Sequence, residues 1–371
     1  MTRFVTKLAA GTAAFALAVT PGVAAAQTSS GVDEKTGPVA FANAAALKVG
    51  NAGEDGGTVI SETQRSPLKP GVSKLSQDRT AVPKDEGEKK ALGPYYLLSL
   101  GKFGPEVDNP FPEGVASRDH NVSAQLKDTT VPTAVAEANY ALRDFRRGGN
   151  SARDNTVFAF QGAKSFVDCA GNDKATGSTT ADKLWVRGKD GKTLEQVEVP
   201  VGDKKFEAKD LPAGPSIDVD AKADLAKTKT DLTISRVTAF DQLLKQAAWR
   251  SGDTTVAAGW QVELVTHVKD AKGDKLQDVK TTIVLGGVSC SLPKGFTPAN
   301  PGGAAGGGQQ VQQPNVPVKI PAGVTAPPEV IEDAGSSPLG YALLGGGVLL
   351  AAGAIAVTRR RRPTGTPSSG E

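Results

Sequence analysis

A two-residue alternation of apolar and polar side chains recurs along the middle of this chain and constrains its fold most strongly. Such alternation is typical of strands that bury one face. Turn residues lie between alternating segments, as Asp190-Gly191 does between two of them, and predict hairpins. The sequence therefore predicts a mainly β protein with an antiparallel β-sandwich-like domain. The alternating segments are 155–160, 183–187, 193–199, 216–220, 231–235, 259–268 and 279–285.

Two other regions depart from this regular pattern. The segment 239–249 is rich in the helix formers Ala, Leu, Lys and Gln, and we expect it to form one short crossover helix. Near the N-terminus, the segments 39–49 and 58–61 are expected to add edge strands to the domain that follows.

The beginning of the chain has the three parts of a secretory signal peptide. Arg3 and Lys7 supply the basic part, and the apolar stretch 8–19 is too short to cross a bilayer. Small residues then precede a predicted cleavage site between Ala26 and Gln27. The sequence therefore predicts that the rest of the chain is exported.

The C-terminal region holds a second apolar segment, 338–358, which carries no charge over 21 residues. A helix of that length matches the roughly 30 Å hydrocarbon core of a bilayer. The basic run that follows predicts a stop-transfer signal that stays in the cytoplasm. This run consists of Arg359, Arg360, Arg361 and Arg362. We therefore expect a single-pass cell-membrane protein whose N-terminus is extracellular, at the cell surface.

This C-terminal layout resembles the sorting regions of Gram-positive surface proteins, especially actinobacterial ones. In those proteins a pentapeptide of the type Leu-Pro-x-Thr-Gly precedes an apolar span and a basic tail. Here 331–335 reads Ile-Glu-Asp-Ala-Gly, and Ala334 stands where the threonine of the scissile bond would be. The resemblance implies a surface location, but without an intact pentapeptide we expect retention by the membrane helix rather than transfer to the wall.

The segment before the membrane span is rich in Pro, Gly and Gln and has no aromatic residue, so it cannot bury enough apolar area to fold. The expected organisation is a signal peptide (1–26), a polar N-terminal region with edge strands (27–90), a β-rich extracellular domain (91–296), a disordered stalk (297–337), a transmembrane helix (338–358) and a basic cytoplasmic tail (359–371).

The whole chain carries a net charge of +3, but the signal peptide contributes +2 and the tail +3, which leaves −2 for 27–358. Nucleic acid is therefore not an expected partner.

Cys169 and Cys290 are the only cysteines. In an exported protein an even pair most simply predicts one disulfide, which here would close a loop of more than half the domain. A redox-active pair is the alternative, but the C-x-x-C spacing typical of such sites is missing. Cys169 and the final strand 285–290 are also similar to secreted actinobacterial β-domains, a resemblance that carries no catalytic residue over to this chain.

Few residues offer catalytic or metal chemistry. The chain has two histidines: His120 is expected in a solvated loop and His267 in a strand. No Gly-x-Ser-x-Gly motif supplies a serine nucleophile. Asp218, Asp220 and Asp224 cluster without the loop pattern of an EF-hand, and a solvated face is the simpler interpretation. We expect no catalytic residue, no metal site and no cofactor.

Three tryptophans leave two interpretations open. Trp185, Trp249 and Trp260 could form a ligand-stacking surface, because a flat indole suits the face of a sugar ring. Trp185 and Trp260, however, alternate with their neighbours as core residues do.

The sequence favours a non-enzymatic function. We expect a membrane-anchored surface protein that presents an extracellular β-domain for envelope structure or for binding a ligand, a cell-wall polymer or another surface protein. The alternative is an exported hydrolase that acts on wall polymers with two carboxyl groups as acid and base. That chemistry would require a cleft with two carboxyl groups about 5–10 Å apart.

Overall fold

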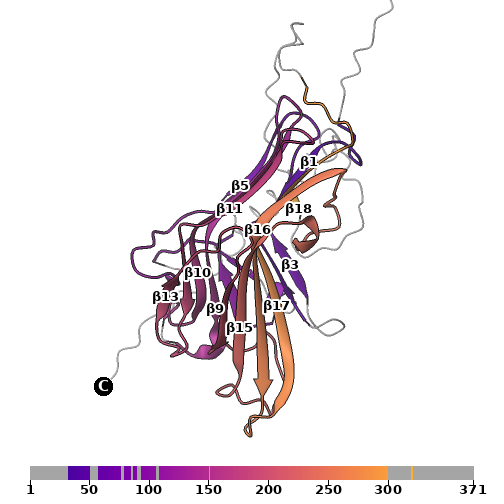
Figure 1. Ribbon diagram of the computed structural model, residues 1–371. Helices are drawn as coiled ribbons and strands as arrows, with labels where there is room; N and C mark the ends of the chain where they lie inside the picture. The colour runs from indigo at the N-terminus through magenta and orange to yellow at the C-terminus, as the bar shows by residue number, and fades with distance from the viewer. Residues whose placement is uncertain are drawn as a thin grey trace, which may run out of the picture.

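The computed structural model describes residues 32–50, 57–76, 79–84, 87–89, 93–105, 108–149, 151–299 and 319–320. The predicted signal peptide with its cleavage site, the membrane span and Arg359 to Arg362 lie outside these residues. Within them, the strands form two antiparallel sheets that pack face to face, as the mainly β prediction requires (Figure 1). No helix in the described ranges is long and apolar enough to span a membrane.

The first sheet, sheet A, contains nine of the described strands. They are β1 (Val39–Ala42), β2 (Ala45–Val49), β3 (Thr58–Ser61), β4 (Thr63–Arg65), β14 (Phe206–Leu211), β15 (Lys229–Val237), β16 (Thr254–Lys269), β17 (Lys275–Leu292) and β18 (Lys319–Ile320). Their order is β14-β15-β16-β17-β1-β4-β18, and β2 pairs with β17 and β3. The hairpin between β16 and β17 turns at 270–274, as the sequence predicts.

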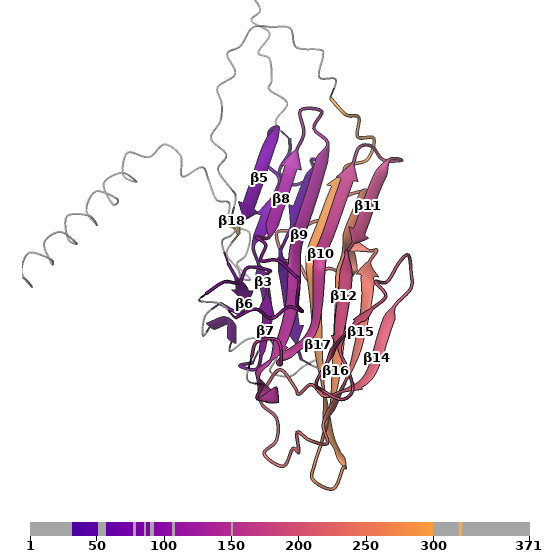
Figure 2. The same cartoon turned by 90° about the vertical axis from the view of Figure 1, so that its left-hand side faces the viewer.

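The second sheet, sheet B, also contains nine described strands and is seen face on in Figure 2. They are β5 (Gly71–Ser76), β6 (Ala81–Val82), β7 (Tyr96–Ser99), β8 (Asn121–Leu126), β9 (Pro132–Asp144), β10 (Thr156–Cys169), β11 (Ala175–Thr180), β12 (Lys183–Arg187) and β13 (Leu194–Val197). Their order is β13-β12-β10-β9-β7-β6, with β8 and β5 added to β9 and with β11 added to β10. The Asp190-Gly191 turn joins β12 to β13, with Gly191 at φ 72°.

Of four long strands, β9, β10 and β17 change partners midway, and β16 pairs with β15 only from Gly259 onward, so that together they divide the sandwich into two tiers. Strand β10 pairs first with β12 and then with β11, and β17 pairs first with β2 and then with β1. The register shifts where the partners change, beside Gly162 and Gly259. We call the half with β1, β4, β5, β8 and β11 the upper tier, and the half with β2, β3, β7 and β12 to β15 the lower tier (Figures 1 and 2).

The two tiers have different cores. Many inward side chains of the upper tier are alanines, among valines and small polar residues, whereas aromatic and leucine side chains fill the lower tier. The upper set comprises Ala40, Ala42, Ala124, Ala134, Ala136, Ala163 and Ala258. The lower set comprises Leu47, Leu98, Tyr140, Leu142, Phe158, Phe160, Leu184, Leu232, Trp260 and Leu264. Because alanine is small, the two sheets lie close together at the top: a Cβ added to Gly286 of β17 would lie 3.4 Å from that of Ala136 in β9.

The upper tier is joined between the sheets at both sides. On one side, the Gly259 N–H of β16 donates to the Thr179 hydroxyl of β11 at 3.0 Å. On the other, the Ser73 hydroxyl of β5 donates to the Gln64 amide oxygen of β4 at 2.7 Å. This tier therefore resembles a flattened barrel, which leaves little open edge.

Two chain segments cover parts of the outer faces of the sheets. The segment 238–252, which includes the 3₁₀ helix η2 (Phe240–Gln242), covers the outer face of sheet A around β1, β2 and β3 and stacks Trp249 on Phe41 at 5.2 Å between ring centroids. The segment 101–118 covers the lower part of sheet B and buries Phe111 against Trp185. The other 3₁₀ helix, η1 (Phe145–Arg147), follows β9 at the lower end.

Three expectations about local structure are wrong. Only η2 is helical within 239–249, because the Gln242 side chain accepts the N–H groups of Thr238 and Ala239 and the segment then lies flat on sheet A. The segment 216–220 is not a strand: it crosses the lower end of the sandwich, with the Ser216 hydroxyl 3.1 Å from that of Thr281. The third wrong expectation is that the N-terminal segments 39–49 and 58–61 add strands at an edge of the domain.

The strands of the N-terminal region are integral parts of sheet A rather than additions at an edge. Strand β1 lies between β17 and β4, and β2 lies between β17 and β3. All four residues of β1 are buried. Position 90 therefore does not separate two structural units, and 39–82 belongs to the same sandwich as 93–292.

Candidate functional site

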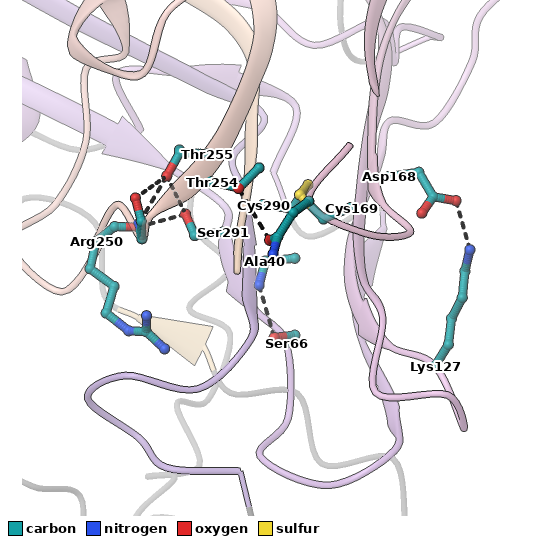
Figure 3. The surroundings of a disulfide bond; sticks show 12 residues. Ala40, Ser66, Lys127, Asp168, Cys169, Arg250, Thr254, Thr255, Cys290 and Ser291 are labelled. Atoms are coloured by element: carbon teal, nitrogen blue, oxygen red, sulfur yellow. Dashed lines mark hydrogen bonds and ion pairs between the residues drawn. A yellow bond between two sulfur atoms is a disulfide. The ribbon is translucent and has the colours of Figure 1, made fainter. Parts of the chain in front are cut away.

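The disulfide predicted from the two cysteines is present and links the two sheets in the upper tier (Figure 3). Cys169 ends β10 in sheet B, and Cys290 lies near the end of β17 in sheet A. Their Cα atoms are 6.0 Å apart, and both residues are fully buried. The bond is a structural link within the alanine-lined core.

The chain enters and leaves the sandwich beside this disulfide. Val39 at the start of β1 lies opposite Ser291 at the end of β17. Arg250 connects the two segments, since its guanidinium donates to the Gly37 carbonyl and its own carbonyl accepts the Ser291 hydroxyl at 3.2 Å (Figure 3). Burial lowers the pKa of this arginine, and the neighbouring Arg65 adds to the effect.

The segment that follows β17 stays attached to the upper end. The Lys294 N–H donates to the Asp253 carboxylate at 2.6 Å, and the Ala299 N–H donates to the Thr129 carbonyl at 2.8 Å. Of the predicted stalk, 319–320 is described again as β18, which pairs with Thr63 and Gln64 of β4. The segment predicted as the stalk therefore begins at the same end of the sandwich as β1.

At the opposite, lower end, a closing loop (212–218) lies across the space between the sheets. Arg146 holds it: its Nε and Nη2 donate to the carbonyls of Pro215 and Ile217 at 3.1 and 2.8 Å, and its guanidinium stacks on Tyr95. The Asp144 carboxylate is fully buried and accepts the N–H groups of Gly214 and Arg146. These charged groups therefore bind the backbone of the loop.

Buried hydroxyl groups hold the same loop from inside. The Tyr96 hydroxyl donates to the Gly214 carbonyl at 2.8 Å, and the Thr230 hydroxyl donates to the Ala213 carbonyl at 2.7 Å. Burial raises the pKa of Tyr96 well above its usual range, so this phenol stays protonated. The arrangement is that of a satisfied structural network.

Two surface hollows lie at opposite ends of the sandwich. One, of about 480 Å³, lies in the upper tier between β5 and the β8–β9 turn and includes Asp128. The other, of about 270 Å³, lies beside the closing loop and includes Asp144. Each is therefore lined by one carboxylate, whereas the hydrolase alternative needs a pair.

His267 lies on the outer face of sheet A, between carboxylates of two neighbouring strands. Its Nδ1 lies 2.8 Å from Asp278 of β17, and its Nε2 lies 3.5 Å from Asp231 of β15. Lys275 also pairs with Asp278, at 2.7 Å. His267, Asp231 and Asp278 are each about one third exposed and belong to a charged strand surface. His120, in contrast to the expected solvated loop residue, is 1% exposed immediately before β8.

The three clustered aspartates do not converge on one point. Asp218 accepts the Tyr95 hydroxyl at 2.6 Å, while Asp220 and Asp224 accept N–H groups of their own turns. Among the described residues, no group of three or more His, Cys, Asp or Glu side chains is arranged to hold a metal ion.

The tryptophans lie in three different clusters and are all buried. Trp260 is in the main core, Trp249 lies under the segment 238–252, and Trp185 lies under the segment 101–118. Their exposed fractions are 0, 5 and 7%. The structure therefore contradicts a common stacking surface of these residues and agrees with the core interpretation.

Comparisons with models of protein families, with curated proteins and with solved structures give no match for this chain. The function is therefore inferred from the chain's own residues.

Proposed function

We propose that this chain is a membrane-anchored, non-enzymatic surface protein that holds a β-sandwich outside the cell and binds a cell-wall polymer. The observation that carries the proposal is the position of the chain's two connections. The sandwich begins at β1 and ends at Ala299 in the same tier, so a tether from one end leaves the lower tier and the outer faces accessible.

The position of the disulfide supports a tethered role. A pull on the stalk reaches the end of β17 once the β18 pairing and the contacts of Ala299 and Lys294 are released, and Cys290 lies two residues before the last residue of that strand. Its bond to Cys169 connects this end to the opposite sheet, so β17 cannot separate from the sandwich beyond this point without breaking a covalent bond. Such a link suits a domain that is loaded through its C-terminal connection.

The surroundings of the acidic groups favour binding over hydrolysis. Asp144 is committed to the backbone of the closing loop, and Asp231 and Asp278 lie on a sheet face beside His267. A glycosidase acid and base would instead flank the scissile bond of a bound sugar.

Removal of the predicted anchor tests the location. Deletion of 338–371 should release a folded, disulfide-bonded protein into the medium, because the apolar span and the stop-transfer arginines are lost. Deletion of 363–371 alone is the matched control and should leave the protein in the membrane fraction. The proposal is wrong if the longer deletion stays in the membrane, or if the complete chain is found in the cytosol.

A further inference from the structure

The segment predicted as the stalk returns to the sandwich after leaving it. The chain leaves at the upper end, where the Ala299 N–H donates to the Thr129 carbonyl at 2.8 Å. It is described again at β18, which pairs antiparallel with β4 of the same tier (Figure 1). Both ends of the connection 300–318 are therefore held by the upper tier.

Strand β18 lies on an edge of sheet A that is otherwise open. Among the described strands, β4 has β1 on one side and β18 on the other, and β18 is the last strand of the sheet. The backbone N–H and C=O groups along such an edge pair readily with an extended segment. The chain itself supplies this segment, from a part of the sequence that follows the last long strand, β17.

The pairing between β18 and β4 is kept short from both sides. Pro317 and Pro321 flank β18, and a proline has no N–H to donate to a neighbouring strand. On the partner strand, Ile320 lies opposite Thr63, and the residue before it, Glu62, has φ 57°, which ends the extended backbone of β4 there. Because few backbone hydrogen bonds hold so short a ladder, it opens more easily than the rest of the sheet.

The attachments of the chain beyond β17 follow one another in order of increasing strength. From the C-terminal side, the first is the β18 ladder, and the next are the hydrogen bonds of Ala299 and Lys294. The last is the disulfide of Cys290, which is covalent. A pull from the C-terminal side therefore opens the short ladder first, while β17 stays linked to sheet B.

We infer that β18 is a detachable strap that sets the reach of the tether. With β18 paired, only 321–337 connects the sandwich to the predicted membrane span, a length of about 55 Å when fully extended. With β18 released, the connection is 300–337, which extends to about 125 Å. The reach above a membrane rests on the proposed anchor, whereas the pairing and release of the strap do not.

Hydrogen exchange tests the pairing in the complete chain, purified in non-ionic detergent with its disulfide intact. Lys319→Pro removes an N–H from the paired segment and adds a proline between the two that flank it. The amides of β4 that face β18 should then exchange about tenfold faster, while those of β10 and β16 stay protected.

Val324→Pro is the matched control, because it also adds one proline to the predicted stalk but lies outside the pairing. It should exchange like the unchanged chain. The strap is wrong if Lys319→Pro leaves the exchange of β4 unaltered, or if both variants increase it equally. Protection of β4 that disappears on dilution would mean that β18 of a second copy fills the edge, which also overturns an intramolecular strap.

Single-molecule pulling on the two ends of the same protein measures the change in reach. The unchanged chain and Val324→Pro should lengthen by about 70 Å at low force, before the sandwich unfolds, because 300–320 is released. Lys319→Pro should lack this step, since its strap is already open. Absence of the step from all three proteins would overturn the strap without affecting the proposed anchor, which the deletion of 338–371 tests separately.

Discussion

The upper and lower tiers are built from the same four long strands, yet different interactions hold them. The lower tier buries large side chains such as Trp260, Phe158 and Leu264, and each such side chain contributes about 1.5–3 kcal/mol when fully buried. Among the described residues, the upper tier has no buried aromatic ring of this size between its sheets and contains many alanines, each of which contributes much less. In the upper tier, apolar burial stabilises the packing of the two sheets less, and the disulfide and the hydrogen bonds between the sheets also connect them. The comparison shows that one continuous sheet can change its means of stabilisation along its length.

The largest effect should come from the lower core. Trp260→Ala should lower the free energy of unfolding by about 3–5 kcal/mol, because a fully buried indole is replaced by a cavity. The indole packs on Phe160 at 5.0 Å between ring centroids, and its N–H donates to the Thr180 carbonyl. Urea unfolding measures the change. Trp260→Phe, which keeps an aromatic ring, should lose less, and equal losses for both variants would contradict this explanation.

Removing the disulfide should have a smaller and more local effect. The double variant Cys169→Ala, Cys290→Ala should lose about 2–4 kcal/mol, because the unfolded chain is no longer constrained across 121 residues. Hydrogen exchange should increase chiefly in the upper tier, at 163–169 and 286–292, since these segments have the alanine core. The comparison between tiers would fail if exchange increased equally around Trp260.

A larger side chain in the upper core should also destabilise the protein. Ala136→Leu should cost about 1–3 kcal/mol, because β17 approaches closely at Gly286 and leaves no room for three more carbon atoms. Val135→Leu is the control on the neighbouring, outward position and should change stability by less than about 0.5 kcal/mol. Tolerance of Ala136→Leu would mean that the sheets can separate.

The same difference between tiers explains which strands the sequence revealed. Strands β16 and β17 are recognisable because large apolar residues alternate with polar ones, as in 260–268. Strand β9 has inward alanines beside small outward residues in its first half, so the apolar contrast is weak and the strand was not predicted. Strand β11 reads Ala-Thr-Gly-Ser-Thr-Thr and has no large apolar residue at all.

The candidate site was less predictable than the fold. An even pair of cysteines in an exported chain was enough to predict the disulfide, because no other pairing exists. The exposed position of Phe166 on sheet B could not be derived from the sequence, because an exposed phenylalanine looks the same there as a buried one. Only the positions of the two covering segments show which outward aromatic residue remains open.

The smallest predicted effect concerns the charged lower face of sheet A. Partial burial alone would raise the pKa of Asp278, but the hydrogen bonds from Lys275 and His267 outweigh it and hold the pKa below its usual range. A carboxyl whose pKa is lower in the folded state stabilises the fold above its unfolded pKa of about 3.9 and loses this contribution as the pH falls through the folded value. Asp278→Asn should therefore lower the free energy of unfolding at pH 7 by less than about 1 kcal/mol, because these groups are partly exposed and screened by solvent. Urea unfolding from pH 7 to pH 2 should show the difference between the two proteins disappearing below about pH 4, where the unfolded-state carboxyl becomes protonated. A difference that stays constant down to pH 2 would mean that the substitution acts through packing rather than through the charge.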